Sequence, residues 1–299
     1  MADVVVDRPA GRLRRLSAAL YRHPRLKLGL MLGGPLVWML VVYLGALALL
    51  FANAFWRVDV FTSRVVREWG LQNFKILLDN PVYATITWRT VYIAAGVTVA
   101  DLVLGFPLAY YAARIASPRV RSALLVAVVL PLWSSYLIRA FAWSTITATR
   151  GLLDSVLQAI GFGSPQIGAS QWAVGLTFTY LWLPFVTLPL YATLERIPGS
   201  LLEASNDLGA RGWMTFRRVV WPLAFPGIVA GSIFSFSLTL GDYIAPTLVG
   251  NTKFIGNVIY DNVGVANNLP FAAAYALVPV AVMAAYLFFA RRLGAFEAL

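Results

Sequence analysis

The 299-residue chain has no cysteine, a single histidine and few charged residues. Without cysteine it can form no disulfide, no thiolate zinc site and no cysteine nucleophile. His23 stands alone in an arginine-rich N-terminal segment, which excludes a histidine-rich metal site and a serine–histidine–carboxylate triad. We interpret His23 as a solvated or headgroup-facing residue, and we expect neither a metal site nor a catalytic residue.

Lysine is also scarce, and this bears on nucleotide binding. A phosphate-binding loop of the G-x-x-x-x-G-K-[ST] type needs a lysine directly after a glycine. None of the three lysines, Lys27, Lys75 and Lys253, follows a glycine. We therefore expect no nucleotide or other cofactor in this chain and no enzyme activity. Energy for any transport would have to come from an ion gradient or from another subunit.

What the chain has in excess is apolar sequence. Hydrophobic residues make up 60% and charged residues 12%, and the mean hydropathy is +0.73. Soluble domains have roughly 45–50% and 25%, so this composition indicates a protein that lies in a lipid bilayer. The net charge of +11 could suggest nucleic acid as a partner. Most of the basic residues lie between apolar runs, however, and we expect no nucleic-acid binding.

Six apolar runs are long enough to cross a bilayer, which takes about 20 residues per helix. They cover residues 29–51, 84–113, 122–144, 172–194, 224–247 and 269–290. None alternates with a period of two, and the first follows a long charged segment, which favours a retained helix over a cleaved signal. The sequence predicts an all-α membrane protein with six transmembrane helices.

Basic residues are unequally divided between the two sides of this arrangement, and cytoplasmic loops carry the excess. One side holds Arg8, Arg12, Arg14, Arg15, Arg22, Arg25, Lys27, Arg114, Arg119, Arg121, Arg196, Arg211, Arg217, Arg218, Arg291 and Arg292; the other holds Arg57, Arg64, Arg67, Lys75, Arg150 and Lys253. Both termini are therefore predicted to be cytoplasmic. The expected parts are a basic segment 1–28, a membrane domain 29–290 and a tail 291–299. Of the lysine and arginine residues, only Arg89 and Arg139 fall within the apolar runs.

The connection between the fourth and fifth runs reads IPGSLLEASNDLGARGWMTFRRVVWPLAFPGI. Its Pro-Gly pair breaks the preceding helix. Ser200 with Glu203 three residues later forms a capping box, which predicts a new helix from this point. Gly209 is placed to end that helix in a left-handed conformation. A second short helix is expected through Trp213 and Phe216.

The first of these short helices has one small, partly apolar face. Its residues are Leu201, Leu202, Ala204, Ser205 and Leu208. Pro222 marks the entry to the fifth run. Two interpretations are open from the residues alone: the loop at 200–218 docks a cytoplasmic partner, or it is an amphipathic linker that lies on lipid headgroups.

The same stretch resembles the EAA loop of bacterial ABC importer permeases. That motif reads Glu-Ala-Ala, three residues, Gly, nine residues, then Ile-x-Leu-Pro. The matching positions are Glu203, Ala204, Ser205, Gly209, Val219, Trp221 and Pro222, of which Ser205, Val219 and Trp221 depart from the motif. The resemblance implies a type I importer bundle. It also implies that Glu203, Ala204, Ser205, Leu208 and Gly209 couple to a separate ATPase, which binds ATP and Mg.

Three further stretches resemble the polyamine branch of that family. They are GLQNFKILLDN, LPLWSSYLIRAFAW and GDYIAPTLVGN. The resemblance implies a permease subunit for spermidine, putrescine or related small organic cations in a bacterial cytoplasmic (inner) membrane. Implied partners are an ATPase dimer, a second homologous permease and an extracytoplasmic binding protein. Alternatives are an ABC permease for sugar, sulfate or iron, an ion-driven secondary transporter, or a membrane scaffold.

Polar residues recur on one face of the fifth run. Ser232, Ser235, Thr239 and Asp242 are spaced at i, i+3, i+7 and i+10, which places them on the same side of a helix. This stripe could line a translocation pathway, with Asp242 offering a carboxylate and Tyr243 an aromatic face to a cation. Alternatively, the hydroxyl groups join neighbouring helices.

Asp101 and Arg139 also fall within the runs, where an ionisable residue is a functional candidate. Asp101 shares a face with Ala94, Thr98, Gly105 and Ala112, so this face is predicted to look into the protein. We favour a structural role for Asp101 over a place in the pathway.

Arg139 lies near the outer end of the third run with Trp133, Tyr136 and Trp143. It either extends to the headgroups or lines an outer vestibule, where it would oppose a cationic substrate unless it were paired. Trp133 is included among the pathway candidates. The other tryptophans are predicted to be belt or packing residues: Trp38, Trp56, Trp69, Trp172 and Trp182.

Overall fold

The computed structural model describes residues 21, 24–59, 61–161 and 167–292, and it divides into two units, Met1–Asn53 and Ala54–Leu299. The first unit contains α2 (Pro24–Met39), the π-helical turn η1 (Leu40–Leu44) and α3 (Gly45–Asn53). Residues 31–53 are long and apolar enough to span a membrane, as predicted for 29–51. Most of the basic N-terminal segment, His23 and residues 293–299 lie outside the described residues.

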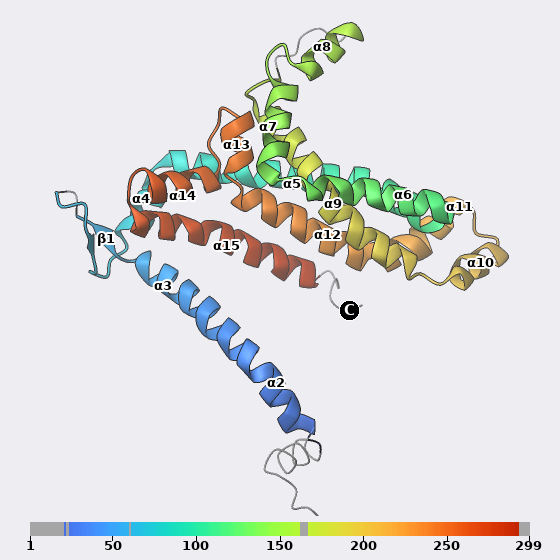
Figure 1. The fold of residues 1–299 in the computed structure, drawn as a ribbon, viewed down its shortest axis with the longest axis horizontal. Helices are drawn as coiled ribbons and strands as arrows, with labels where there is room; N and C mark the ends of the chain where they lie inside the picture. The colour runs from blue at the N-terminus through green and yellow to red at the C-terminus, as the bar shows by residue number, and fades with distance from the viewer. Residues whose placement is uncertain (1–20, 22–23, 60, 162–166, 293–299) are drawn as a thin grey trace, which may run out of the picture. The chain divides into compact units, whose positions relative to one another are not determined.

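Three long helices form the centre of the second unit. They are α5 (Pro81–Arg114), α9 (Gln171–Glu195) and α12 (Trp221–Gly241), which pack along one another (Figure 1). α5 begins where Pro81 needs no hydrogen-bond partner for its nitrogen and the Asn80 side chain accepts from the Val82 amide at 3.0 Å. The most buried side chains lie between these helices, including Phe178, Leu181 and Leu190. α15 (Leu269–Arg292) packs beside them.

The third predicted span is not one helix. The prediction of a continuous helix over 122–144 was wrong, because the chain forms α6 (Pro118–Val129), the 3₁₀ turn η2 (Leu130–Trp133) and α7 (Tyr136–Thr147), bent by 97°. Pro131 lacks an amide hydrogen, and Ser134 and Ser135 are extended. The described chain therefore has five helices able to span a membrane, or six if this bent pair is counted as one.

The fifth span also ends earlier than predicted. The sequence indicated a helix to residue 247, but α12 stops at Gly241 and Asp242 is extended, with ψ at 135°. A short helix α13 (Ile244–Val249) follows, and α14 (Ile255–Gly264) leads to α15. Two of the six predicted spans are thus interrupted.

The connection from α3 to α5 begins with a two-stranded antiparallel sheet, in which β1 (Arg57–Val58) pairs with β2 (Val65–Val66). The helix α4 (Gln72–Asp79) follows. The buried Asn73 amide holds this connection together, because it donates to the carbonyls of Ala54 and Trp56 at 2.8 Å each. A separate helix, α8 (Leu152–Ala159), comes after α7.

Candidate functional site

The connection between α9 and α12 is a compact element at one end of the bundle, opposite the end that holds α4 and α14 (Figure 1). It contains α10 (Gly199–Asp207), α11 (Gly212–Thr215) and the π-helical turn η3 (Phe216–Val220). We call residues 198–220 the connecting element. From Gly212 to Gly241 the helices follow one another without a break, so movement of the connecting element would be passed directly to α12.

For α10, the sequence prediction is wrong at the start of the helix and right at its end. The predicted capping box was wrong: α10 begins directly after Pro198, and Ser200 lies inside the first turn without a cap hydrogen bond. The prediction for Gly209 is confirmed, since its φ is +76°. The Gly209 amide donates to Asn206 O at 2.8 Å and the Ala210 amide to Ser205 O at 3.1 Å, the bond pair of a Schellman motif.

One side of α10 packs against the bundle. Leu202 lies against the buried cluster of Leu194, Ile197 and Val220, and the Ser205 and Thr215 hydroxyl groups are 3.0 Å apart. Arg114 at the end of α5 donates to the carbonyls of Leu194 and Ile197 where α9 ends. The direction in which the chain leaves α9 is therefore fixed by the neighbouring helix.

The opposite side of α10 is open and partly apolar. Leu208 is 88% exposed, and Glu203 and Ala204 are also exposed. A groove of about 300 Å³ lies between α10 and the segment that follows it, lined by Leu201, Ala204, Ser205, Leu208, Ala210, Met214, Arg218 and Val219. The predicted coupling residues thus lie together on one element, and the sequence analysis did not single out Met214 and Arg218.

Aromatic rings join the connecting element to α5. Phe216 lies with its ring centroid 5.7 Å from Phe106, and Trp221 lies 5.9 Å from the same ring. Trp213 stacks on Phe216 at 5.4 Å. The tryptophan that departs from the family motif therefore fills a contact between α12 and α5.

The polar stripe on α12 lies between helices. Ser232, Ser235 and Thr239 are all buried. Tyr286 on α15 donates to the Ser232 hydroxyl at 2.6 Å, and Ser235 donates to the Asp101 carboxylate on α5, also at 2.6 Å. These bonds join neighbouring helices, which is the alternative role that the sequence suggested for the hydroxyl groups. A role of the stripe in a translocation pathway stays a prediction.

Asp101 is fully buried, and its Oδ1 atom has no hydrogen-bond partner among the described residues. The face it shares is buried as predicted, with Ala94 at 0%, Thr98 at 7% and Ala112 at 2% exposure. On this face a Cβ added to Gly105 would come within 3.0 Å of Thr187. The bond from Ser235 is therefore a main polar support of a buried carboxyl group.

We expect Ser235→Ala to lower the stability of the protein by about 1–3 kcal/mol, because it leaves Asp101 without its hydroxyl donor. Thermal unfolding of the detergent-purified protein measures this. Ser237→Ala is the matched control, since among the described residues the Ser237 hydroxyl bonds only to Phe234 O in its own helix, at 3.2 Å. Equal melting temperatures for the two variants would contradict the structural role. Lost uptake at unchanged stability would instead favour a pathway role for Ser235.

Asp242 closes the gap between α12 and α13. Its Oδ1 accepts from the amides of Ile244 and Ala245 at 2.8 and 3.0 Å. Its Oδ2 accepts a hydrogen bond from the Tyr136 hydroxyl at the start of α7. The breaks in the third and fifth spans are thereby joined by one hydrogen bond.

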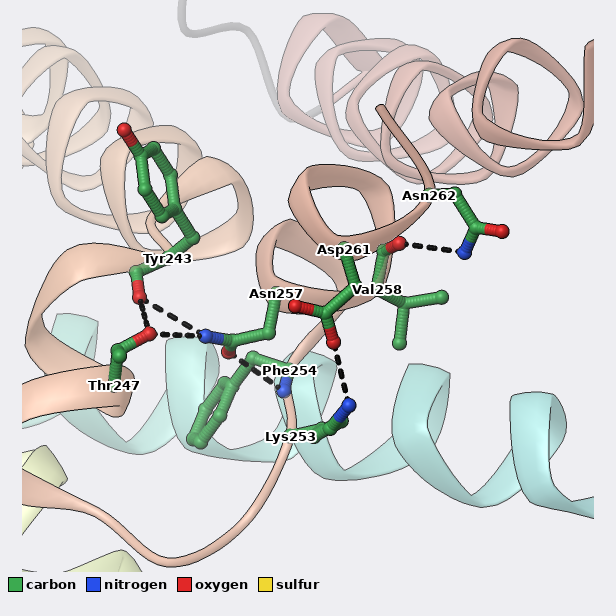
Figure 2. Close-up of polar contacts among 8 residues, drawn as sticks. All are labelled: Tyr243, Thr247, Lys253, Phe254, Asn257, Val258, Asp261 and Asn262. Carbon is green, nitrogen blue, oxygen red and sulfur yellow. Dashed lines mark hydrogen bonds and ion pairs between the residues drawn. The ribbon is translucent and has the colours of Figure 1, made fainter. Parts of the chain in front are cut away.

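Asn257 is a site residue that the sequence analysis missed. Its amide nitrogen donates to Tyr243 O at 3.0 Å and to the Thr247 hydroxyl at 2.7 Å, and its carbonyl accepts from the Phe254 amide at 3.0 Å (Figure 2). The Tyr243 ring stacks on Tyr260 at 4.5 Å. Asn257 therefore fixes α13 against α14. A lone amide among Phe254, Ile255 and Val258 was the available signal.

Arg139 lies over the ring of Tyr136, 6.0 Å from its centroid. It is half-buried, and its Nε and Nη1 atoms have no acceptor among the described residues. Tyr136 also stacks on Trp182 at 5.9 Å. Trp133 is 85% exposed on η2. Whether Arg139 and Trp133 face a pathway stays a prediction.

The five tryptophans predicted to be belt or packing residues divide between surface and core. Trp38, Trp69 and Trp172 are at least 70% exposed, and Trp182 is 6% exposed between aromatic neighbours. Trp56 is half-buried under the Arg67 guanidinium, whose carbon lies 5.3 Å from the ring centroid. These positions fit surface and packing roles.

Residues 105–296 match the family model described as "Binding-protein-dependent transport system inner membrane component". The chain is 45% identical to the inner membrane ABC transporter permease protein YdcU of Escherichia coli, over 96% of each chain. It is 35% identical to the spermidine/putrescine transport system permease protein PotB of Haemophilus influenzae, over 71% of this chain and 75% of that one.

The fold is similar to that of a solved bacterial ABC transporter chain. That transporter is involved in the import of the acidic polysaccharide alginate; the TM-score is 0.69, the identity is 19%, and 93% of this chain and 98% of that chain are covered. At this identity the likeness bears on the fold alone.

Proposed function

Because the chain belongs to the family of binding-protein-dependent transport system inner membrane components, we propose that it imports polyamines or related small organic cations as one permease subunit of an ATP-driven transporter. It is a multi-pass protein of the inner membrane and a transport component. The polyamine assignment rests on the PotB relatives, whose names state spermidine and putrescine.

The structure of the connecting element is the observation that best supports the ATP-driven mechanism. The element offers an open groove bordered by Leu208, it follows the end of α9 that Arg114 of α5 holds, and it continues into α12. In the proposed mechanism two ATPase subunits bind ATP and Mg and close on each other. The groove follows the ATPase surface to which it is bound, and α12 tilts with it.

In this mechanism the substrate passes near the end of α12 that is farther from the connecting element. A binding protein delivers it at the outer face, and a second, homologous permease completes the passage. Asp242 and Tyr243 lie where α12 ends, so a tilt of α12 moves the groups that close the outer end. In this scheme both termini and the connecting element are cytoplasmic, as the distribution of basic residues predicts.

The test is purification of the permease with the subunits that it retains, followed by uptake in proteoliposomes. We expect an ATPase to co-purify and Glu203→Lys to reduce its association at least tenfold, because a reversed charge enters the interface. Asp207→Lys tests whether the effect depends on the position of the reversed charge, since Asp207 is also exposed on α10. Radiolabelled putrescine, spermidine, sulfate and a sugar are compared as substrates.

The possible results separate the proposals. Uptake of sulfate or sugar in place of polyamine would overturn the substrate class and leave the ATP-driven mechanism standing. Uptake that follows a proton or sodium gradient without any ATPase would overturn the mechanism.

A further inference from the structure

An apolar groove runs between α5 and α9 on the surface of the second unit. It has a volume of about 350 Å³, and its wall includes Ile93, Val97 and Leu176. The floor is formed by glycine: a Cβ added to Gly96 or Gly175 would meet no atom within 4 Å. The groove is therefore open space and not a packed helix contact.

The position of the groove along α5 places it in the hydrocarbon layer near one membrane surface. At about 1.5 Å per residue, Tyr92 lies about 33 Å from Arg114 at the other end of α5, and the hydrocarbon core is about 30 Å thick. The exposed rings of Trp88 and Trp172 lie at the same end, as expected of an interfacial belt. Arg89 lies one helical turn beyond Tyr92, at headgroup height.

A second cavity, of about 450 Å³, continues the groove toward the headgroups. Pro81, Thr85 and Arg89 line it, and it shares Tyr92 and Gln171 with the groove. The Tyr92 hydroxyl donates to the Gln171 side chain at this junction. An apolar compartment and a more polar one therefore meet at the Tyr92 and Gln171 side chains.

Arg89 is the unneutralised charge at this rim. Its Nη1 donates to the Lys253 carbonyl at 3.3 Å, while Lys253 itself pairs with Asp261. Within the described parts of the chain no carboxylate forms an ion pair with Arg89. The remaining N–H groups of its guanidinium can bind a phosphate, for which this planar donor set is well suited.

We propose that this groove binds an anionic phospholipid, with an acyl chain between α5 and α9 and the phosphate on Arg89. A lipid fits the space better than a partner helix does. A transmembrane helix, about 10 Å across, would bring no phosphate to neutralise Arg89. An acyl chain is narrower and can reach the glycine floor.

Native mass spectrometry of the detergent-purified transporter, with phosphatidylglycerol and phosphatidylcholine added in equal amounts, tests the proposal. We expect the wild type to retain phosphatidylglycerol preferentially. Arg89→Gln lowers that preference at least fivefold. Gly96→Leu fills the groove and removes bound lipid of both kinds. Leucine is a better helix former than glycine, so this variant is expected to fold.

Each of these two variants has a matched control. Arg64→Gln removes an exposed arginine from the outer loop, and Val99→Leu enlarges an exposed α5 side chain outside the groove lining. Both should retain lipid as the wild type does. Equal retention of the two lipids by the wild type, or an unchanged preference in Arg89→Gln, would overturn the proposal.

A cysteine introduced at position 96 gives an independent test, because the chain has none of its own. The cysteine is labelled in membranes with a lipid-soluble maleimide. A decrease in labelling when phosphatidylglycerol is added supports the lipid site. Efficient cross-linking of this cysteine to a second permease subunit would instead make the groove a helix interface and overturn it. These binding results do not depend on which solute is transported.

Discussion

We expect ATP-driven uptake to fall at least tenfold when Leu208 is replaced by aspartate. Leu208 is 88% exposed at the end of α10 and borders the groove of the connecting element. In the proposed mechanism the ATPase buries this side chain, and a carboxylate there would lose its hydration without gaining a partner. Truncation of central interface residues costs about 2 kcal/mol or more, or about 30-fold in affinity. Binding of the purified ATPase to the permease in nanodiscs measures the loss.

Leu78→Asp is the control for this variant. Leu78 is 85% exposed on α4, at the end of the bundle opposite the connecting element. The two changes add the same charge at equally exposed leucines, so a general effect on folding or insertion would appear in both. Normal ATPase binding by Leu208→Asp would show that the groove is not the docking surface.

Hydropathy predicted the number and place of the membrane helices well, but it predicted their breaks poorly. An average over about 20 residues does not register Ser134 and Ser135, which interrupt an otherwise apolar run. The early end of α12 has a similar cause, since the residues after Asp242 are apolar although they form a separate helix. In both places local backbone geometry overrides a continuous apolar pattern.

The connecting element could be predicted from local chemistry where that chemistry had no competitor. Gly209 adopts the left-handed conformation that its position required. Ser200 does not cap α10, because the chain already enters the helix from Pro198, whose ring fixes φ near the helical value. Glycine at a helix end was therefore a safer guide than a pair of polar residues at its start.

Contacts between distant parts of the chain could not be predicted from a single sequence. Helical spacing correctly placed Ser232, Ser235 and Thr239 on one buried face. It could not show that the partner of Ser235 is Asp101, 134 residues away. Nor could it show that Tyr136 and Asp242, at the two breaks, are bonded. Such pairs depend on how the helices cross.

Tyr136→Phe is expected to reduce uptake by about tenfold, and Asp242→Asn by no more than that. Tyr136→Phe removes the hydrogen bond between α7 and the end of α12, whereas Asp242→Asn only weakens it, because a neutral amide that donates to the Tyr136 hydroxyl replaces the carboxylate oxygen. The asparagine Oδ1 can still accept from the amides of Ile244 and Ala245, so α13 keeps its start. Uptake in proteoliposomes at saturating binding protein measures the loss, and Asp242→Ala should lose more because it also removes the cap.

The double variant distinguishes a positioning role of Asp242 from direct binding of a cation. If the carboxylate acts through Tyr136, the double variant is no worse than Tyr136→Phe alone, because that change has already removed the bond. If the carboxylate instead binds the substrate, Asp242→Asn is much more damaging than Tyr136→Phe, and its effect grows with the number of positive charges on the polyamine. The three bonds that Asp242 accepts from Tyr136, Ile244 and Ala245 favour the first outcome, since they use three of the roughly four acceptor sites of the carboxylate.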